Sequence, residues 1–300
     1  GASAGAIGAA LGAAAEHGRA AGGFAKLAAL PAELGEGRLA ALFQPLELLM
    51  IGGAALGAFL VGNNNKAIKA TLAALPSLFK GSRYTKELYM ELMSLLFEVL
   101  SKVRKEGLMS IEGDIDKPEE SPLFSKYPAV LADHHIVEFM TDYLRMMVGG
   151  NLNTVEIESL MDVELETHHH EAAEPGHVVA SVAGAVPAFG IVVAVMGVVN
   201  VMGSVGSPPA VLGKMIGGAL VGTFLGILLS YGFVTPVASL LEQKAHEGSK
   251  IYQVIKVVLL ASMSGYAPQV AVEFGRKVLF AGDRPTFSEL EEELKARKGK

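Results

Sequence analysis

The sequence has no cysteine, and charged residues account for only 19% of its 300 positions. Without cysteine there is neither a disulfide framework nor a thiolate metal site. A soluble domain normally carries about a quarter charged residues, so the low charge content points to an environment other than water. The formal net charge of -6 further argues against nucleic-acid binding through a basic surface.

Charge is also unevenly distributed. Two long segments, Val178–Val205 and Met215–Leu241, contain no Asp, Glu, Lys, Arg or His. A bilayer core requires roughly 20 apolar residues per helix, and both segments are long enough to cross it with some tilt. The alternative is a pair of buried core helices in a large soluble protein. Uncharged runs of about 18 residues or more favour a membrane span, so we predict two spans here.

The N-terminal region has a mixed character. Gly1–Leu30 is rich in Ala and Gly but carries several charges, so it suits a helix and only weakly suits a membrane. Leu46–Gly62 is mostly apolar and short for a span, but it reaches the required length together with Leu39–Gln44. Pro45 fits the first turn of that helix, where its missing N–H costs nothing.

Between Lys66 and His177 the charged residues become frequent. Apolar residues recur at helical spacing, which predicts a bundle of amphipathic helices in water. A charged helical tail is predicted over Ser288–Lys300. The sequence thus predicts an all-α, polytopic helical membrane protein with an N-terminal membrane region (1–65), a cytoplasmic helical domain (66–177), two pore-lining spans (178–241) and cytoplasmic C-terminal helices (242–300). The clearest helical spacing is that of Leu88, Leu92, Leu95, Leu96 and Leu100.

Basic residues predict the orientation of the chain. Lys and Arg are concentrated in Lys66–Lys126 and after Leu241, whereas the connection between the two uncharged segments has only Lys214. Because short cytoplasmic loops carry an excess of Lys and Arg, we expect the middle domain and the tail in the cytoplasm and the turn Gly206–Pro209 outside. An even number of spans would require a further span within Gly1–Gly35.

Small residues dominate the two uncharged segments. Glycines four residues apart let helix backbones approach closely in lipid, and plain packing explains most of them. Thr223 carries a hydroxyl that either serves an ion path or bonds its own i−4 carbonyl. Pro187 and Pro236 each remove a backbone hydrogen bond, which spans tolerate where neighbours or water satisfy the freed carbonyl. The small residues are Ala183, Gly190, Ala194, Gly197, Gly218, Gly222 and Gly226.

Neither uncharged segment contains a carboxylate. A proton-driven machine needs a titratable group within the membrane, so a partner would have to supply it if this chain conducts protons. No P-loop, nucleophile triad or metal-binding pattern is present, and we therefore predict no enzyme and no metal site. The consecutive histidines His168–His170 could bind a metal. On a helix they would point in different directions and make a poor metal site, so we predict a solvated loop near the membrane instead. Asp133–His135 favours a helix surface.

Long strings of this sequence resemble the MotA family, the larger subunits of the bacterial flagellar stator. The resemblance runs from about Gly37 to the end and keeps the family order. It is carried by LAALFQPLELLMIGGAALGAFLVGN, NKAIKATLAALPSLF, YPAVLADHHIVEFMTDYLR, NTVEIESLMDVELETH, VPAFGIVVAVMGVV, GALVGTFLGILLSYGFVTP and GYAPQVAVEFGRK.

The resemblance implies four spans, with a large cytoplasmic loop between the second and third, in a bacterial inner membrane. It implies five copies around two copies of MotB, which supplies the membrane aspartate that carries the proton, and no other cofactor. The cytoplasmic domain would push on the rotor protein FliG. The family begins with a strongly apolar first span, whereas Gly1–Gly35 contains charges. This segment either inserts with its polar groups near the ends or is an altered, mis-started or engineered terminus.

The resemblance also implies roles for individual residues. Pro187 and Pro236 match prolines that couple ion flow to movement. Thr223 matches a channel threonine and Tyr231 a conduction-linked tyrosine. Ala194 stands where sodium-driven relatives carry a second threonine, and one oxygen fewer favours protons. The pair that contacts FliG corresponds to Arg104 and Glu112.

Two other functions stay open from the sequence. An energiser of the ExbB/TolQ type would drive an envelope protein instead of rotation, but such proteins typically have three spans and lack the charged pair. The second possibility, from a different class, is a passive protein: either a helical scaffold or a solute transporter. Transporters often show an inverted repeat between their halves, and the sequence shows none.

Overall fold

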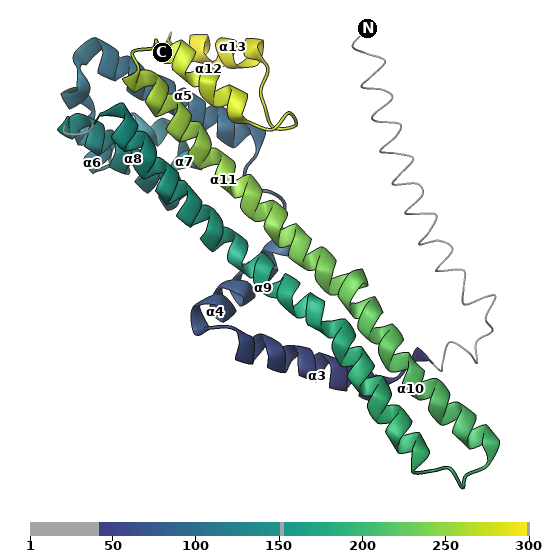
Figure 1. Cartoon of the computed structure of the whole chain (residues 1–300). Coiled ribbons are helices and arrows are strands. Elements are labelled where there is room, and N and C mark those ends of the chain that lie inside the picture. The colour runs from purple at the N-terminus through teal and green to yellow at the C-terminus, as the bar shows by residue number, and fades with distance from the viewer. Residues whose placement is uncertain (1–41, 151–152, 299–300) are drawn as a thin grey trace. The chain divides into compact units, whose positions relative to one another are not determined.

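The computed structural model describes residues 42–150 and 153–298. Every regular element in these ranges is a helix, and they contain no strand (Figure 1). The all-α prediction is thereby confirmed. Three of the described helical stretches are long and apolar enough to cross a membrane: Pro45–Gly62, Thr154–Met202 and Pro209–Met263. The further span predicted within Gly1–Gly35 lies outside the described residues.

The described chain divides into two compact units. The apolar unit comprises residues 42–62 and 181–235, and the bundle unit comprises Asn63–Ala180 together with the residues from Pro236 onward. Each unit therefore joins segments that are far apart in the sequence. The four-part division at residues 65, 177 and 241 follows composition rather than contacts, and it stays a prediction.

The apolar unit contains α3 (Pro45–Gly62), the second part of α9 (Thr154–Met202) and α10 (Pro209–Leu229). Helix α3 starts at its proline, as predicted, and it packs against α10 (Figure 1). Proline at the first turn also starts α10, because its fixed φ suits a helix start and its absent N–H is not needed there. A small apolar core around Ile51, Val193 and Val221 holds the three helices together.

A π-helix, Ser230–Val234, follows α10, and α11 (Thr235–Met263) continues from it. The segment Met215–Leu241, predicted as a span, thus lies within the apolar helical stretch Pro209–Met263. The structure adds a π-turn inside this segment and extends the helix past Leu241. The cause is local. A proline inside a helix lacks a donor and clashes with the preceding turn, and a single π-turn is a common way to absorb such a disturbance.

The bundle unit is built around α5 (Lys86–Glu106), whose two ends have clear local causes. The Thr85 hydroxyl accepts a hydrogen bond from the Leu88 N–H, which caps the helix N-terminus. Gly107, at φ 88°, ends the helix in a conformation that side chains disfavour. The predicted apolar stripe is confirmed as core, since all its leucines are buried: Leu88, Leu92, Leu95, Leu96 and Leu100.

Further helices complete the bundle unit around that stripe. Its core includes side chains of α5, α8, α9, α11 and α12, and α12 and α13 both contact α5 (Figure 1). The remaining helices of the unit are α4 (Asn65–Ala74), α6 (Glu112–Asp116), α7 (Pro128–Leu131), α8 (His134–Gly149), α12 (Pro268–Val278) and α13 (Phe287–Lys298), with short 3₁₀ turns at Leu75–Phe79, Leu108–Ile111 and Phe124–Lys126.

The predicted loop at His168–His170 is wrong, because these residues lie inside α9. Helix α9 begins well before the uncharged segment, and its polar first part presents Ile157 and Met161 to the core of the bundle unit. Burial of that apolar stripe favours a helix over a solvated loop. A composition change thus marks a change of surroundings rather than a helix end.

Candidate ion path and coupling site

Three glycines set the approach of α9 and α10 in the apolar unit. A Cβ atom on Gly190 would lie 2.7 Å from the Gly222 carbonyl oxygen and 2.9 Å from the Gly226 Cα. A Cβ on Gly226 would in turn lie 2.8 Å from the Gly190 Cα. The two backbones are therefore in direct contact, which only glycine permits. These positions serve helix packing, whereas a Cβ on Gly218 would lie 3.6 Å from the Nε2 of Gln44, the residue just before α3.

Thr223 lies beside that contact with its side chain half-buried. Several hydroxyls in the described helices bond their own i−4 carbonyl, as Thr71 and Ser249 do. The Thr223 hydroxyl makes no such bond in the described part of the chain, so it is free to meet another group. Ala194 is buried and packs against Gly222, whose Cβ would lie 3.1 Å from the Ala194 nitrogen.

The break at Pro187 is filled from the other helix. Pro187 cannot donate to the Ala183 carbonyl, four residues earlier in α9. The Ser230 hydroxyl donates to that carbonyl instead, at 2.7 Å in a buried position. Sequence reasoning overlooked Ser230, although a serine in an otherwise apolar segment is a signal that could have identified it.

The second break combines the π-helix with Pro236. Within the π-helix the Thr235 N–H donates to the Ser230 carbonyl, five residues earlier, and Pro236 follows as the second residue of α11. Tyr231 lies in this turn with 68% of its surface exposed in the single chain. Both prolines thus interrupt the backbone hydrogen bonding of a long apolar helix, and their role in coupling stays a prediction.

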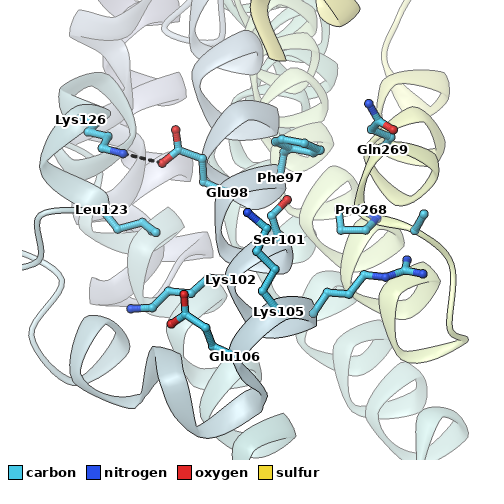
Figure 2. Close-up of a pocket in the computed structure, with 12 residues that line it drawn as sticks. Phe97, Glu98, Ser101, Lys102, Lys105, Glu106, Leu123, Lys126, Pro268 and Gln269 are labelled. Atoms are coloured by element: carbon cyan, nitrogen blue, oxygen red, sulfur yellow. Dashed lines mark hydrogen bonds and ion pairs between the residues drawn. The ribbon is translucent and has the colours of Figure 1, made fainter. Parts of the chain in front are cut away.

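The predicted rotor-contact pair lies on the bundle unit. Arg104, in the last turn of α5, lines a groove of about 410 Å³ between α5 and the start of α12, which Figure 2 shows with Lys105 and Pro268. Glu112 begins α6, and its side chain is exposed outside that groove. Arg104 and Glu112 form no ion pair with each other among the described residues. Both are available to an external partner.

Other cations around this groove are already paired. Lys126 holds Glu98 at 2.8 Å, the dashed line in Figure 2, and Lys102 holds Asp114 at 2.7 Å. In contrast, Arg104 and Lys105 have no ion pair in the described structure. The groove therefore presents its unpaired positive charge at the end of α5, where a helix C-terminus favours basic side chains.

The three consecutive histidines diverge, as predicted from helix geometry. The His168 ring packs on Tyr252 with 4.4 Å between ring centroids. The His169 Nδ1 lies 2.9 Å from the Ser249 hydroxyl, and His170 lies 3.8 Å from Glu166. Each ring has its own partner within the bundle unit, and this arrangement gathers no shared ligand set. Asp133 precedes α8, and His134 and His135 are exposed on it, as expected.

Fold and site together define an all-helical chain whose apolar helices are suited to a membrane, with a close glycine contact and two proline breaks. Two family models match it: Motility protein A N-terminal over residues 21–107, and the MotA/TolQ/ExbB proton channel family over residues 132–254. The chain is 54% identical over 260 residues to Motility protein A of Salmonella typhimurium, covering 87% of this chain and 88% of that one. It belongs to the motility protein A family.

Other relatives agree with this assignment. Identity to Motility protein A of Escherichia coli is 54% over 262 residues, covering 87% of this chain and 89% of that protein. A solved flagellar MotAB stator complex from Bacillus subtilis is similar at a TM-score of 0.64 and 25% identity, with 84% of this chain and 89% of that one covered. The C. jejuni MotAB structure shares the fold at a TM-score of 0.66, 21% identity and coverages of 82% and 88%.

Proposed function

We propose that this chain is a stator subunit of the bacterial flagellar motor, which forms a proton channel with MotB and converts ion flow into torque. The observation that carries the proposal is 54% identity to Motility protein A over most of both chains. The match to a proton channel family and the likeness to a flagellar MotAB stator complex support it. The separate match to the Motility protein A N-terminal model favours this function over an ExbB/TolQ-like energiser.

The assembly that we propose has five copies of this chain around two copies of MotB in the bacterial inner membrane. Each copy crosses the membrane four times, with the bundle unit and the C-terminus in the cytoplasm. The partner's aspartate is the proton carrier, which fits the absence of any carboxylate from Val178–Val205 and Met215–Leu241. The chain transports protons without a further cofactor and performs no enzymatic reaction.

The mechanism assigns a role to each site residue. Protonation of the partner's aspartate changes how the two MotB helices sit inside the ring, and the ring then moves relative to MotB. Thr223 and Tyr231 border the proton path. The spans bend at Pro187 and Pro236, because each proline removes one backbone hydrogen bond from its helix. The bundle unit transmits the movement to FliG.

Proton selectivity follows from the side chains of the path. Hard cations such as sodium require several oxygen ligands. Thr223 offers one hydroxyl, and Ala194 offers none. A proton needs only a single acceptor at each step, so the pair favours protons. Swimming speed that rises with sodium concentration at fixed pH would contradict this assignment.

A flux measurement tests the central proposal. The chain is co-reconstituted with its MotB partner into vesicles that hold a pH-sensitive dye, and a potassium diffusion potential drives proton entry. We expect flux with the intact partner and its loss when the partner's membrane aspartate is replaced by Asn. A matched replacement of a partner aspartate outside the membrane serves as the control. Flux that persists without the membrane aspartate would overturn the mechanism.

A further inference from the structure

The hydrogen bond between Ser230 and Ala183 joins the two spans of the apolar unit at their irregular points. A regular helix would pair the Ala183 carbonyl with the N–H of the residue four positions later, and that residue is Pro187. The Ser230 hydroxyl takes this place at 2.7 Å. Its side chain is only 1% exposed, so water does not compete for the carbonyl.

The acceptor of the Ser230 hydroxyl differs from that of most hydroxyls in helices. Thr71, Thr167 and Ser249 each bond the carbonyl four residues earlier in their own helix. The corresponding acceptor for Ser230 would be the Gly226 carbonyl, but its hydroxyl makes no such bond among the described residues. The hydroxyl instead reaches a residue 47 positions away. Default intrahelical bonding therefore does not explain its direction.

The N–H, the carbonyl and the hydroxyl of Ser230 all form hydrogen bonds, and each bond stabilises a different part of the two helices. Its N–H donates to the Gly226 and Ile227 carbonyls and ends α10. Its carbonyl accepts from the Thr235 N–H, which closes the π-turn. Its hydroxyl satisfies the carbonyl freed by Pro187. The close backbone contact at Gly226, whose Cβ would lie 3.1 Å from the Val186 carbonyl oxygen, keeps the hydroxyl within reach.

We propose that Ser230 is a positioning residue that ties the Pro187 break of α9 to the π-turn Ser230–Val234, so that the two breaks move as one. A shift of either helix at its weak point strains this bond and is passed to the other helix. The bond stands on the geometry alone, whereas its part in torque generation rests on the stator function proposed above.

A double-mutant cycle tests the bond without reference to rotation. The full chain is purified with its partner, and thermal unfolding is measured for Ser230→Ala, Pro187→Ala and both together. We expect Ser230→Ala to lower the melting temperature by several degrees, because it leaves a buried carbonyl unsatisfied. Pro187→Ala returns a backbone N–H to that carbonyl, so in this background Ser230→Ala loses little more. Equal losses in both backgrounds would overturn the bond.

Two matched variants keep the cycle interpretable. Ser230→Thr retains the hydroxyl and is expected to melt close to the original protein. Ser181→Ala removes an exposed hydroxyl of α9 that has no hydrogen-bond partner in the described structure, and it is expected to change nothing. A melting temperature for Ser230→Thr as low as that for Ser230→Ala would show that packing volume, and not the hydroxyl, matters there.

Rotation then tests the positioning role. Torque per assembled stator is read from the stepwise speed increments of single motors as stators join. We expect Ser230→Ala to reduce the height of each step several-fold and Ser230→Thr to restore it. A role confined to stability would reduce the number of steps and leave their height unchanged, which would overturn the positioning role. If no variant and not even the original chain drives rotation, the stator function fails while the melting cycle still reports on the bond.

Discussion

At the scale of single residues, Arg276 is a buried cation whose hydrogen bonds change the pKa of a neighbouring carboxylate. Its side chain is 8% exposed, donates to both carboxylate oxygens of Glu273 at 2.7 and 2.6 Å, and donates to the Pro285 carbonyl at 2.9 Å. These hydrogen bonds from Arg276 are the main cause that lowers the pKa of Glu273 from its ordinary value of 4.5. The pair fastens α12 to the segment that leads into α13.

That depressed pKa predicts a pH dependence of stability. A carboxylate whose pKa is lower in the folded chain stabilises it above pH 4.5, and the contribution is lost as the pH falls through the folded value. We therefore expect the melting temperature to fall below about pH 4.5, and Glu273→Gln to flatten this part of the profile. Glu292→Gln, on α13 and exposed, is the control. An unchanged acid profile in Glu273→Gln would show that other groups set it.

Arg104 is a residue whose importance the structure alone would rank low. It is exposed and unpaired among the described residues, so its removal costs the fold little, since surface substitutions usually change stability by within about 0.5 kcal/mol. We expect Arg104→Glu to impair swimming, because exposed charges steer association with a partner. Charge reversal on FliG should restore swimming in part.

The matched control for Arg104 is Lys117→Glu. Lys117 is an exposed cation of the bundle unit whose partner is Glu120. Its reversal should leave swimming intact. Full swimming of the Arg104→Glu strain, with stators assembled in normal amount, would remove Arg104 from the rotor contact.

The sequence predicted the site residues to different extents. Thr223 and the two prolines are unusual within apolar segments, so each attracts notice without a structure. Ser230 did not, because its partner Ala183 lies 47 positions away, and the register of two crossing helices cannot be read from periodicity. Arg104 and Glu112 are ordinary surface charges, and only the resemblance singles them out.

At the scale of elements, composition predicted the helices better than their ends. The apolar stripe of α5 was read correctly because period and burial agree. The continuity of α9 was not predicted, because the polar residues His168–His170 were attributed to a loop although they lie inside the helix. The π-turn before Pro236 could not be foreseen, since proline disturbs a helix in several ways and the neighbouring helix decides among them.

The close contact between α9 and α10 predicts that an added methyl group at their interface lowers the stability of the protein. Gly190→Ala places a methyl group within 2.7 Å of the Gly222 carbonyl oxygen, so the backbones must separate. We expect a loss of roughly 1–3 kcal/mol from overpacking, measured as a lower melting temperature of the purified complex. Gly184→Ala, on the same helix, meets open space and should be neutral or slightly stabilising. Comparable losses in both variants would contradict the close contact.

At the scale of the whole molecule, the chain alternates between two chemistries. It enters the apolar unit, crosses to the bundle unit, and returns before ending in the bundle unit. The sequence predicted this alternation because burial in lipid and burial in water-soluble cores select different compositions. It could not predict which segments pack together, since the glycine contacts that decide this depend on helices far apart in the sequence.

Orientation in the membrane is the prediction that concerns the entire chain. Because the sequence has no cysteine, a single introduced cysteine is the only maleimide-reactive thiol within it. With a membrane-impermeant maleimide on intact cells, we expect Gly206→Cys to be labelled and Glu119→Cys to be protected until the membrane is opened, because basic residues surround the latter segment. Swimming of each variant controls for correct assembly.

The same method decides the number of spans. If Gly1–Gly35 contains a span, the chain crosses the membrane four times, and Ser3→Cys is protected like Glu119→Cys. If it contains none, the number of crossings is odd, and Ser3→Cys is labelled from outside like Gly206→Cys. We expect protection, because an even number of spans places both ends in the cytoplasm. Labelling of Ser3→Cys in swimming cells would show that torque requires only the three described apolar helices of each chain.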